Sequence, residues 1–115
     1  MDVVTTALAN EAIRVRDDGH LNDALIAAGT GASASTVRDW LKARSQPTGV
    51  RAQRLIELGE MIDRLRRVMQ ADYIPVWLSR PLEALDDDKP IELLGRGEYR
   101  RVAQVIAALE DPGVS

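Results

Sequence analysis

The sequence predicts an all-α protein, and three observations support that prediction. Apolar residues recur at spacings of three and four, residues that start and stop helices punctuate the chain, and no segment alternates apolar and polar residues as a half-buried strand does. The 115 residues are 45% hydrophobic and 29% charged, which is typical of a globular domain and too apolar for a disordered chain.

The N-terminal part of the chain predicts three helices. They are expected over residues 3–16, 21–30 and 34–44. The polar run Asp17-Asp18-Gly19 should end the first helix. Asn22 and Ser33 should cap the next two, because a side-chain oxygen at that position accepts a hydrogen bond from a free amide of the first turn. Residues 45–49 have turn chemistry.

A longer linking helix is expected from Thr48 to about residue 70. Its apolar stripe at spacings of three and four consists of Leu55, Leu58, Ile62, Leu65 and Met69. This stripe predicts the buried face of a core helix or a subunit interface, and both can hold in a small protein. Gly59 lowers helix stability by about 1 kcal/mol relative to alanine, so it predicts either close packing or a break at that point.

The last 45 residues predict a small bundle of three short helices. The first is a turn around Trp77, a core residue, with Asp72 as its cap. The second begins at Pro90, which suits a first helical turn, and ends at Gly95 or Gly97. The third carries Tyr99, Val102, Ile106 and Leu109 on one face and ends at Pro112-Gly113.

The residue inventory excludes most catalytic chemistry. The chain has no cysteine and one histidine, His20, in a loop-like stretch, so disulfides, thiolate zinc sites and cysteine nucleophiles are excluded. Gly29-Thr30-Gly31 lacks the lysine of a P-loop, and the consecutive aspartates at 86–88 cannot converge on one ion. The sequence therefore predicts no catalytic residue, no metal and no cofactor. Without an apolar run of about 18 residues or a secretory signal, the predicted location is cytoplasmic, with no membrane contact.

Charge is unevenly distributed along the chain. The net charge is −3, but residues 35–70 carry eight basic and four acidic side chains between two acidic flanks. A local excess of positive charge attracts a polyanion whatever the total charge is. Within this segment, Glu57 and Glu60 are expected to form surface ion pairs with Arg54 and Arg64.

Residues 23–41 fit a helix-turn-helix better than a generic helix pair. Two short crossing helices need a small residue at the crossing and a permissive residue in the turn, and Ala27 and Gly31 supply them. Ile26, Val37 and Trp40 should then form the wedge between the two helices. The predicted architecture is a helix-turn-helix module, a linking helix and a small C-terminal bundle.

In a helix-turn-helix, the second helix enters the major groove of DNA. On its outer face, Ser35, Thr36 and Arg38 are the candidates for base or phosphate contacts. The candidates for backbone phosphate contacts are Lys42, Arg44, Arg51 and Arg54. The alternative is a helical hairpin used only for protein contacts, with these arginines solvated.

The residues that carry a family resemblance are spread over most of the chain. They are Gly31-Ala32-Ser33, Thr36-Val37-Arg38-Asp39-Trp40, Pro47, Arg54-Leu55-Ile56-Glu57-Leu58, Val76-Trp77-Leu78, Pro81, Leu85, Lys89-Pro90, Leu93-Leu94, Gly97-Glu98-Tyr99, Val102 and Gly113-Val114. The ordered set from Trp77 to Gly97 is the most specific part. On these residues the chain resembles the Xre-type antitoxins of RES–Xre type II toxin–antitoxin pairs, whose C-terminal domain is shared by the MbcA and ParS antitoxin-like proteins.

The resemblance implies an Xre-like helix-turn-helix domain at residues 1–50 and an Xre/MbcA/ParS-like toxin-binding domain at residues 51–115. It implies that the protein neutralises a RES-domain toxin, an enzyme that consumes NAD, by blocking the toxin's active site. The toxin contacts carried over onto this chain are Tyr99, Arg100, Arg101, Gly113, Val114 and Ser115. It also implies a homodimer or a larger hetero-oligomer with the toxin, and repression of the protein's own operon through operator DNA.

Two further functions stay open at this point. A stand-alone helix-turn-helix transcriptional regulator with a helical dimerisation domain would bind a palindromic site in a salt-sensitive way and have no toxin partner. A small enzyme would have to depend on His20.

Overall fold

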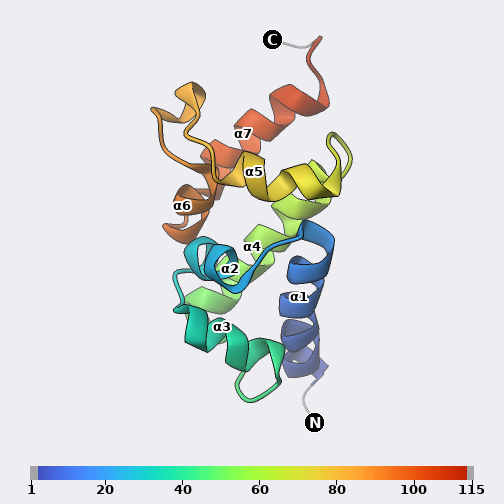
Figure 1. Ribbon diagram of the computed structural model, residues 1–115, viewed down its shortest axis with the longest axis vertical. Helices are drawn as coiled ribbons and strands as arrows, with labels where there is room; N and C mark the ends of the chain where they lie inside the picture. Colours follow the sequence, from blue (N-terminus) through green and yellow to red (C-terminus); the bar gives the residue numbers. More distant parts are fainter. Residues whose placement is uncertain (1–2, 114–115) are drawn as a thin grey trace.

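The structure, a computed structural model, describes residues 3–113 and confirms the all-α prediction (Figure 1). The α-helices in this part of the chain are α1 (Val3–Gly19), α2 (Asp23–Thr30), α3 (Ala34–Leu41), α4 (Gly49–Leu65), α5 (Ile74–Leu78), α6 (Pro90–Gly95) and α7 (Tyr99–Glu110). Two 3-10 helices lie at Ala71–Tyr73 and Glu83–Leu85. Among these described helices, none has both the length and the apolar character that crossing a bilayer requires.

Helix α4 runs through the middle of an elongated molecule that measures 47 × 23 × 23 Å. Figure 1 shows α1 and α3 on one side of α4, and α5 and α7 on the other. Helix α2 packs against both α4 and α6, so the N-terminal helices contact the C-terminal ones directly. At Gly95 the two backbones approach so closely that a Cβ atom would collide with the carbonyl oxygen of Ala28.

One continuous apolar core lies along α4. Leu55, Leu58, Ile62 and Leu65 have no exposed surface, and Met69 packs against them from the edge. The core interpretation of this stripe is confirmed. The subunit-interface interpretation is wrong, because these four side chains are fully buried within one chain and expose no surface that a second subunit could contact. The same core includes side chains from both sides of residue 50, and the two-domain division at that residue stays a prediction.

Three predicted helix-start signals, two caps and a first-turn proline, are confirmed. The side chain of Asn22 accepts a hydrogen bond from the amide of Leu25 at 2.9 Å, and that of Ser33 accepts one from the amide of Thr36 at 3.1 Å. Pro90 occupies the first turn of α6. Each start was predictable because its capping residue lies within three positions of the amide it serves or has a fixed φ.

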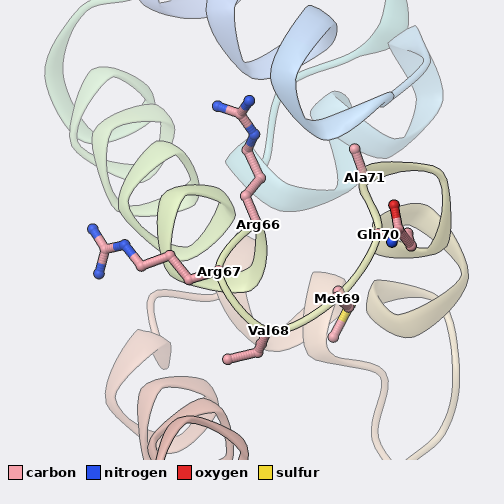
Figure 2. Close-up of a pocket in the computed structure, with 6 residues that line it drawn as sticks. All are labelled: Arg66, Arg67, Val68, Met69, Gln70 and Ala71. Carbon is pink, nitrogen blue, oxygen red and sulfur yellow. The ribbon is translucent and has the colours of Figure 1, made fainter.

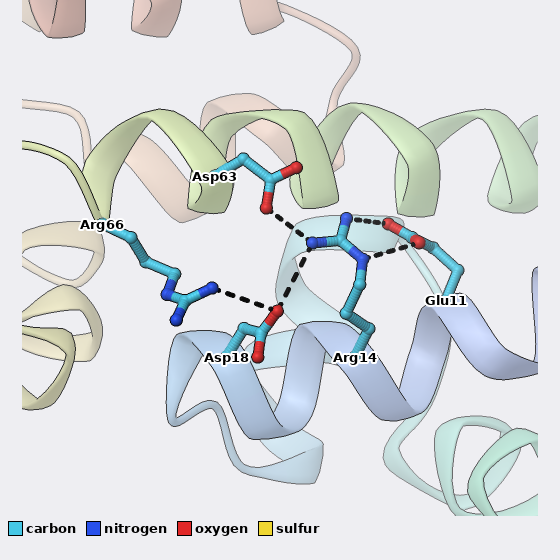
Figure 3. Close-up of polar contacts among 5 residues, drawn as sticks. All are labelled: Glu11, Arg14, Asp18, Asp63 and Arg66. Atoms are coloured by element: carbon cyan, nitrogen blue, oxygen red, sulfur yellow. Dashed lines mark hydrogen bonds and ion pairs between the residues drawn. The ribbon is translucent and has the colours of Figure 1, made fainter.

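Helix α1 continues to Gly19, although the sequence predicted an end at residue 16. The extension is stabilised by ion pairs (Figure 3): Asp18 pairs with Arg14 of the same helix at 3.6 Å and with Arg66, just after α4, at 3.3 Å. Gly19 is buried, and its neighbour His20 ends the helix at a positive φ of 56°. The polar run stays helical because Arg66, just after the end of α4, pairs with Asp18.

The other helix boundaries also differ from the prediction. Helix α2 begins two residues later than expected, α3 ends at Leu41 rather than residue 44, and α4 ends at Leu65 rather than near 70. After α3, Ala43 takes a positive φ of 58° and the amide of Arg44 donates to the carbonyl of Asp39 at 2.8 Å, which closes the helix in a Schellman-type turn. The early end of α4 lets the chain fold back.

The fold-back after α4 buries Ile74, Trp77 and Leu78 in the core. Trp77 is 6% exposed, which confirms its predicted core position. Asp72 does not cap this segment: it lies inside the 3-10 helix, where Gln70 precedes the first turn without a side-chain bond. Leu109 is also misassigned, because 43% of its surface is exposed at the end of α7.

Candidate protein and nucleic-acid interfaces

The region predicted to bind DNA consists of α2, a three-residue turn and α3. Gly31 begins the turn at a φ of 78°, a conformation that glycine adopts without strain. Ile26 and Val37 are fully buried between the helices, and Trp40 is 2% exposed. Helix α3 packs against α2 and also contacts α1, and its outer side, with Ser35 and Arg38, stays exposed.

The side chains on α3 that were predicted to contact bases are only partly available to DNA. Ser35 and Arg38 are exposed, whereas the Thr36 hydroxyl accepts a hydrogen bond from the Ser33 hydroxyl at 2.9 Å. Arg38 also forms an ion pair with Asp23 of α2 at 3.7 Å, with 51% of the arginine side chain exposed. The outward face of α3 therefore presents Ser35 and a partly neutralised Arg38.

The predicted phosphate contacts extend from the end of α3 to the start of α4. Lys42 caps α3, Arg44 lies in the following loop and Arg51 lies in the first turn of α4, and all three are exposed. Arg54 does not belong with them. Its side chain is 22% exposed, pairs with Glu57 at 3.1 Å and faces the turn before α7.

The ion pairs expected within α4 are half correct. Arg54 pairs with Glu57, but Glu57 is 6% exposed and is not a surface residue. Arg64 pairs with Glu110 at the end of α7 instead of with Glu60. Its guanidinium hydrogen-bonds the Glu110 carboxylate and lowers the pKa of that group below its ordinary value. This contact attaches the last turn of α7 to α4.

The predicted toxin contacts lie at the two ends of α7. Tyr99 begins the helix and is half-buried, and Arg100 beside it is exposed. The charge of Arg101 is already paired within the chain, since it forms ion pairs with Asp86 at 3.1 Å and Glu98 at 3.4 Å. Gly113 is exposed beyond the other end of the helix, and Val114 and Ser115 lie outside the described residues.

The two groups of predicted toxin contacts are not brought together. The 12 residues of α7 separate them by about 18 Å at the usual helical rise. A partner that touches both must therefore extend along the helix. Between them, a groove of about 310 Å³ is lined by Ala84, Leu85, Arg101, Gln104, Val105 and Ala108. This groove was not predicted from the sequence, although Arg101, Val105 and Ala108 of α7 recur at the helical spacings of four and three.

A second hollow, of about 590 Å³, follows the turn after α4 (Figure 2). Its lining is Arg66, Arg67, Val68, Met69, Gln70 and Ala71. In the close-up, the side chains of Arg66 and Arg67 extend in different directions from the start of the turn. None of the predicted site residues lines it. Among the described residues, no three histidine, cysteine or acidic side chains converge on a candidate metal site.

The geometry defines a small all-α protein with a central helix and exposed surfaces at both ends, and comparison with known proteins specifies the family. The chain is 36% identical over 80 residues to the mycobacterial cidal antitoxin MbcA of Mycobacterium bovis and of Mycobacterium tuberculosis, which covers 70% of this chain and 71% of the relative. No profile of a known protein family matches the chain.

A solved structure supports the same assignment over the full length. The fold matches a chain of the crystal structure of the M. tuberculosis MbcT–MbcA toxin–antitoxin complex with a TM-score of 0.80 and 30% identity. The match covers 100% of this chain and 99% of that one. The chain therefore belongs to the MbcA family of antitoxins, which confirms the resemblance found in the sequence.

Proposed function

We propose that this chain binds and neutralises a RES-domain, NAD-consuming toxin by occupying the toxin's active site. The observation that carries the proposal is the full-length match to a chain of the MbcT–MbcA complex, at a TM-score of 0.80. Inhibition by occupancy needs no catalytic group on the inhibitor, and a chain with one histidine and no cysteine suits such a role. We therefore propose that the chain is not an enzyme. We also propose that it acts in the cytoplasm, together with its toxin.

The toxin contact is assigned to α7 and the tail that follows it. Arg100 is exposed at the start of α7 and Gly113 is exposed beyond its end, so both are accessible to a partner. The rest of the assignment consists of Tyr99, Arg101, Val114 and Ser115. A partner lying along the whole helix has room for an interface of standard size, about 800 Å² on each side.

Operator binding is proposed as a second role of the same chain. Ser35, Arg38 and Lys42 follow one another at spacings of three and four on the exposed face of α3, with Arg44 and Arg51 nearby. In Figure 1, α3 and α7 lie at opposite ends of the long axis, so DNA and toxin would not compete for space. Binding to a palindromic operator would require a dimer or a larger complex with the toxin.

Co-purification tests the toxin role. The chain is expressed together with the RES-domain protein encoded in the same operon, with an affinity tag on the toxin only. The expected result is one stable complex that survives size-exclusion chromatography at high salt, because apolar burial resists salt while exposed charge pairs do not. A toxin that elutes alone, or an operon without a RES-domain gene, contradicts the proposal and favours a stand-alone regulator.

Removal of residues 111–115 locates the contact within the proposed surface. Helix α7 ends at Glu110, so this truncation leaves the helix complete. We expect weaker inhibition with an unchanged melting temperature, since Asp111, Pro112 and Gly113 are exposed after the end of α7. Full inhibition by the truncated chain would assign the contact to the face of α7.

A further inference from the structure

The turn between α6 and α7 fixes the direction of the proposed toxin-binding helix. The amide of Gly97 donates to the carbonyl of Leu94 at 3.1 Å, and that of Glu98 donates to Leu93 at 2.9 Å. These two bonds and the positive φ of 86° at Gly97 form a Schellman motif. Helix α7 starts two residues later, at Tyr99.

Arg54 of α4 lies directly against this turn. A Cβ atom placed on Gly97 would be 2.7 Å from the Arg54 Cζ atom and 3.1 Å from its Nε atom, and would also collide with Nη2. The guanidinium group therefore packs on the backbone of Gly97, in space that any other residue would fill. Glycine is needed here both for its φ and for this contact.

Neighbouring side chains hold the guanidinium in place. Arg54 Nη1 donates to Oε1 of Glu57 at 3.1 Å, and Gln53 Nε2 donates to Oε2 of the same carboxylate at 3.1 Å. The side chains of Arg54 and Glu57 are 22% and 8% exposed. Because both carboxylate oxygens are engaged and largely shielded from water, the charged pair has one favoured arrangement.

We propose that Arg54 is a positioning residue for the toxin contact. By packing on Gly97, it fixes the direction in which α7 leaves the turn, and hence where Tyr99 and Arg100 point. Glu57 acts indirectly, by orienting the side chain of Arg54. The proposal rests on the proposed function in placing the toxin contact on α7, whereas the effect of Arg54 on the turn does not depend on any partner.

The test combines amide hydrogen exchange of the free chain with toxin binding. The variants are Arg54→Ala, Arg54→Lys and Glu57→Gln, with Arg67→Ala as a control at an exposed arginine beyond the end of α4. In Arg54→Ala, we expect exchange at residues 96–100 to be about tenfold faster, with no change in α1 to α3. Arg54→Lys should restore part of the protection, because lysine can pair with Glu57 but has no planar group to lay on Gly97.

Binding of the RES-domain toxin from the same operon gives the second readout. Arg54→Ala should weaken binding about tenfold, mainly through faster dissociation, and Glu57→Gln should act in the same direction by a smaller factor. The control Arg67→Ala should match the wild type in both measurements.

Three results would overturn the proposal. Unchanged exchange at residues 96–100 in Arg54→Ala would show that the arginine does not hold the turn. Acceleration spread equally over the chain would assign Arg54 a general stabilising role. A locally loosened turn with undiminished toxin binding would separate the turn from the toxin contact. If the wild-type chain itself fails to bind the toxin, the proposed function fails, and the exchange experiment still decides the role of Arg54 at Gly97.

Discussion

Two glycines in this protein lie beneath an arginine, and the two contacts differ in ways that sequence alone does not show. Gly59 of α4 faces Arg14 of α1, and Gly97 before α7 faces Arg54 of α4. In each case the arginine pairs with a glutamate three residues away, Glu11 for Arg14 and Glu57 for Arg54. The two contacts therefore have the same components.

Their surroundings are different. At Gly59, the arginine and glutamate side chains are 35% and 20% exposed and belong to a wider network with Asp63, Asp18 and Arg66 (Figure 3). The hydrogen bond with Glu11 is the main cause that raises the pKa of Arg14 above its ordinary value. At Gly97, the pair is more buried and the glycine has a positive φ. The first contact can rearrange in solvent, whereas the second fixes a backbone turn.

The largest effect is expected for Gly97→Ala. A left-handed conformation costs an alanine about 1–2 kcal/mol, and the new methyl group would displace Arg54 from its place beside Glu57. Together these should lower the free energy of unfolding by about 3 kcal/mol, measured by urea denaturation. A loss below about 1 kcal/mol would mean that the turn adapts and that the contact is not rigid.

Glu57→Ala should lower the free energy of unfolding less than Gly97→Ala does, but more than Glu11→Ala does. Removing Glu57 leaves Arg54 largely shielded and unpaired, which should cost about 2 kcal/mol. Removing Glu11 leaves Arg14 with Asp63 at 2.6 Å and access to water, which should cost less than about 1 kcal/mol. Equal losses in paired urea titrations would contradict the distinction between the two contacts.

Gly59→Ala should change stability by less than about 1 kcal/mol in either direction. A Cβ atom here would collide with Oε1 of Glu11 and lie 2.7 Å from Nη2 of Arg14, but both are the ends of flexible side chains. The gain in helix propensity, about 1 kcal/mol, offsets their displacement. Thermal denaturation measures the outcome, and a loss as large as that of Gly97→Ala would show that the two glycines are equivalent.

The smallest effect concerns the exposed pair between Arg64 and Glu110, a third contact that joins α4 to another helix. Arg64 lowers the pKa of Glu110 in the folded state, so the pair stabilises the fold fully above the ordinary glutamate value of 4.5. That contribution is lost as the pH falls through the lower folded-state pKa. NMR of the last turn of α7 should show fraying in this acidic range, and Glu110→Gln should fray at every pH.

Much of the fold was predictable because its signals are local. Asn22, Ser33 and Pro90 each act within a few residues, and the apolar stripe of α4 predicts a buried face wherever its neighbours lie. The helix ends were less predictable. Helix α1 passes through Asp17 and Asp18 because a cation from beyond α4 pairs with Asp18, and nothing in the local sequence indicates that cation.

The candidate site was predictable only as separate motifs. Arg54 and Glu57 looked like surface charges of one helix, and Gly97 looked like a helix terminator. Both segments carry the family resemblance, yet their contact depends on how α4 and α6 pack. The Arg101 pairing with Asp86 depends in the same way on the loop before α6. Long-range side-chain pairs of this kind follow from the tertiary structure and not from spacing.

We propose that this chain acts by occupying a toxin, and one titration decides whether it does. The RES-domain toxin that we propose as the partner is mixed with increasing amounts of the purified chain, and the consumption of NAD is followed. We expect a linear fall of NAD consumption to zero at a fixed molar ratio of chain to toxin, as for tight binding at the active site. Undiminished NAD consumption in the presence of excess chain would contradict it.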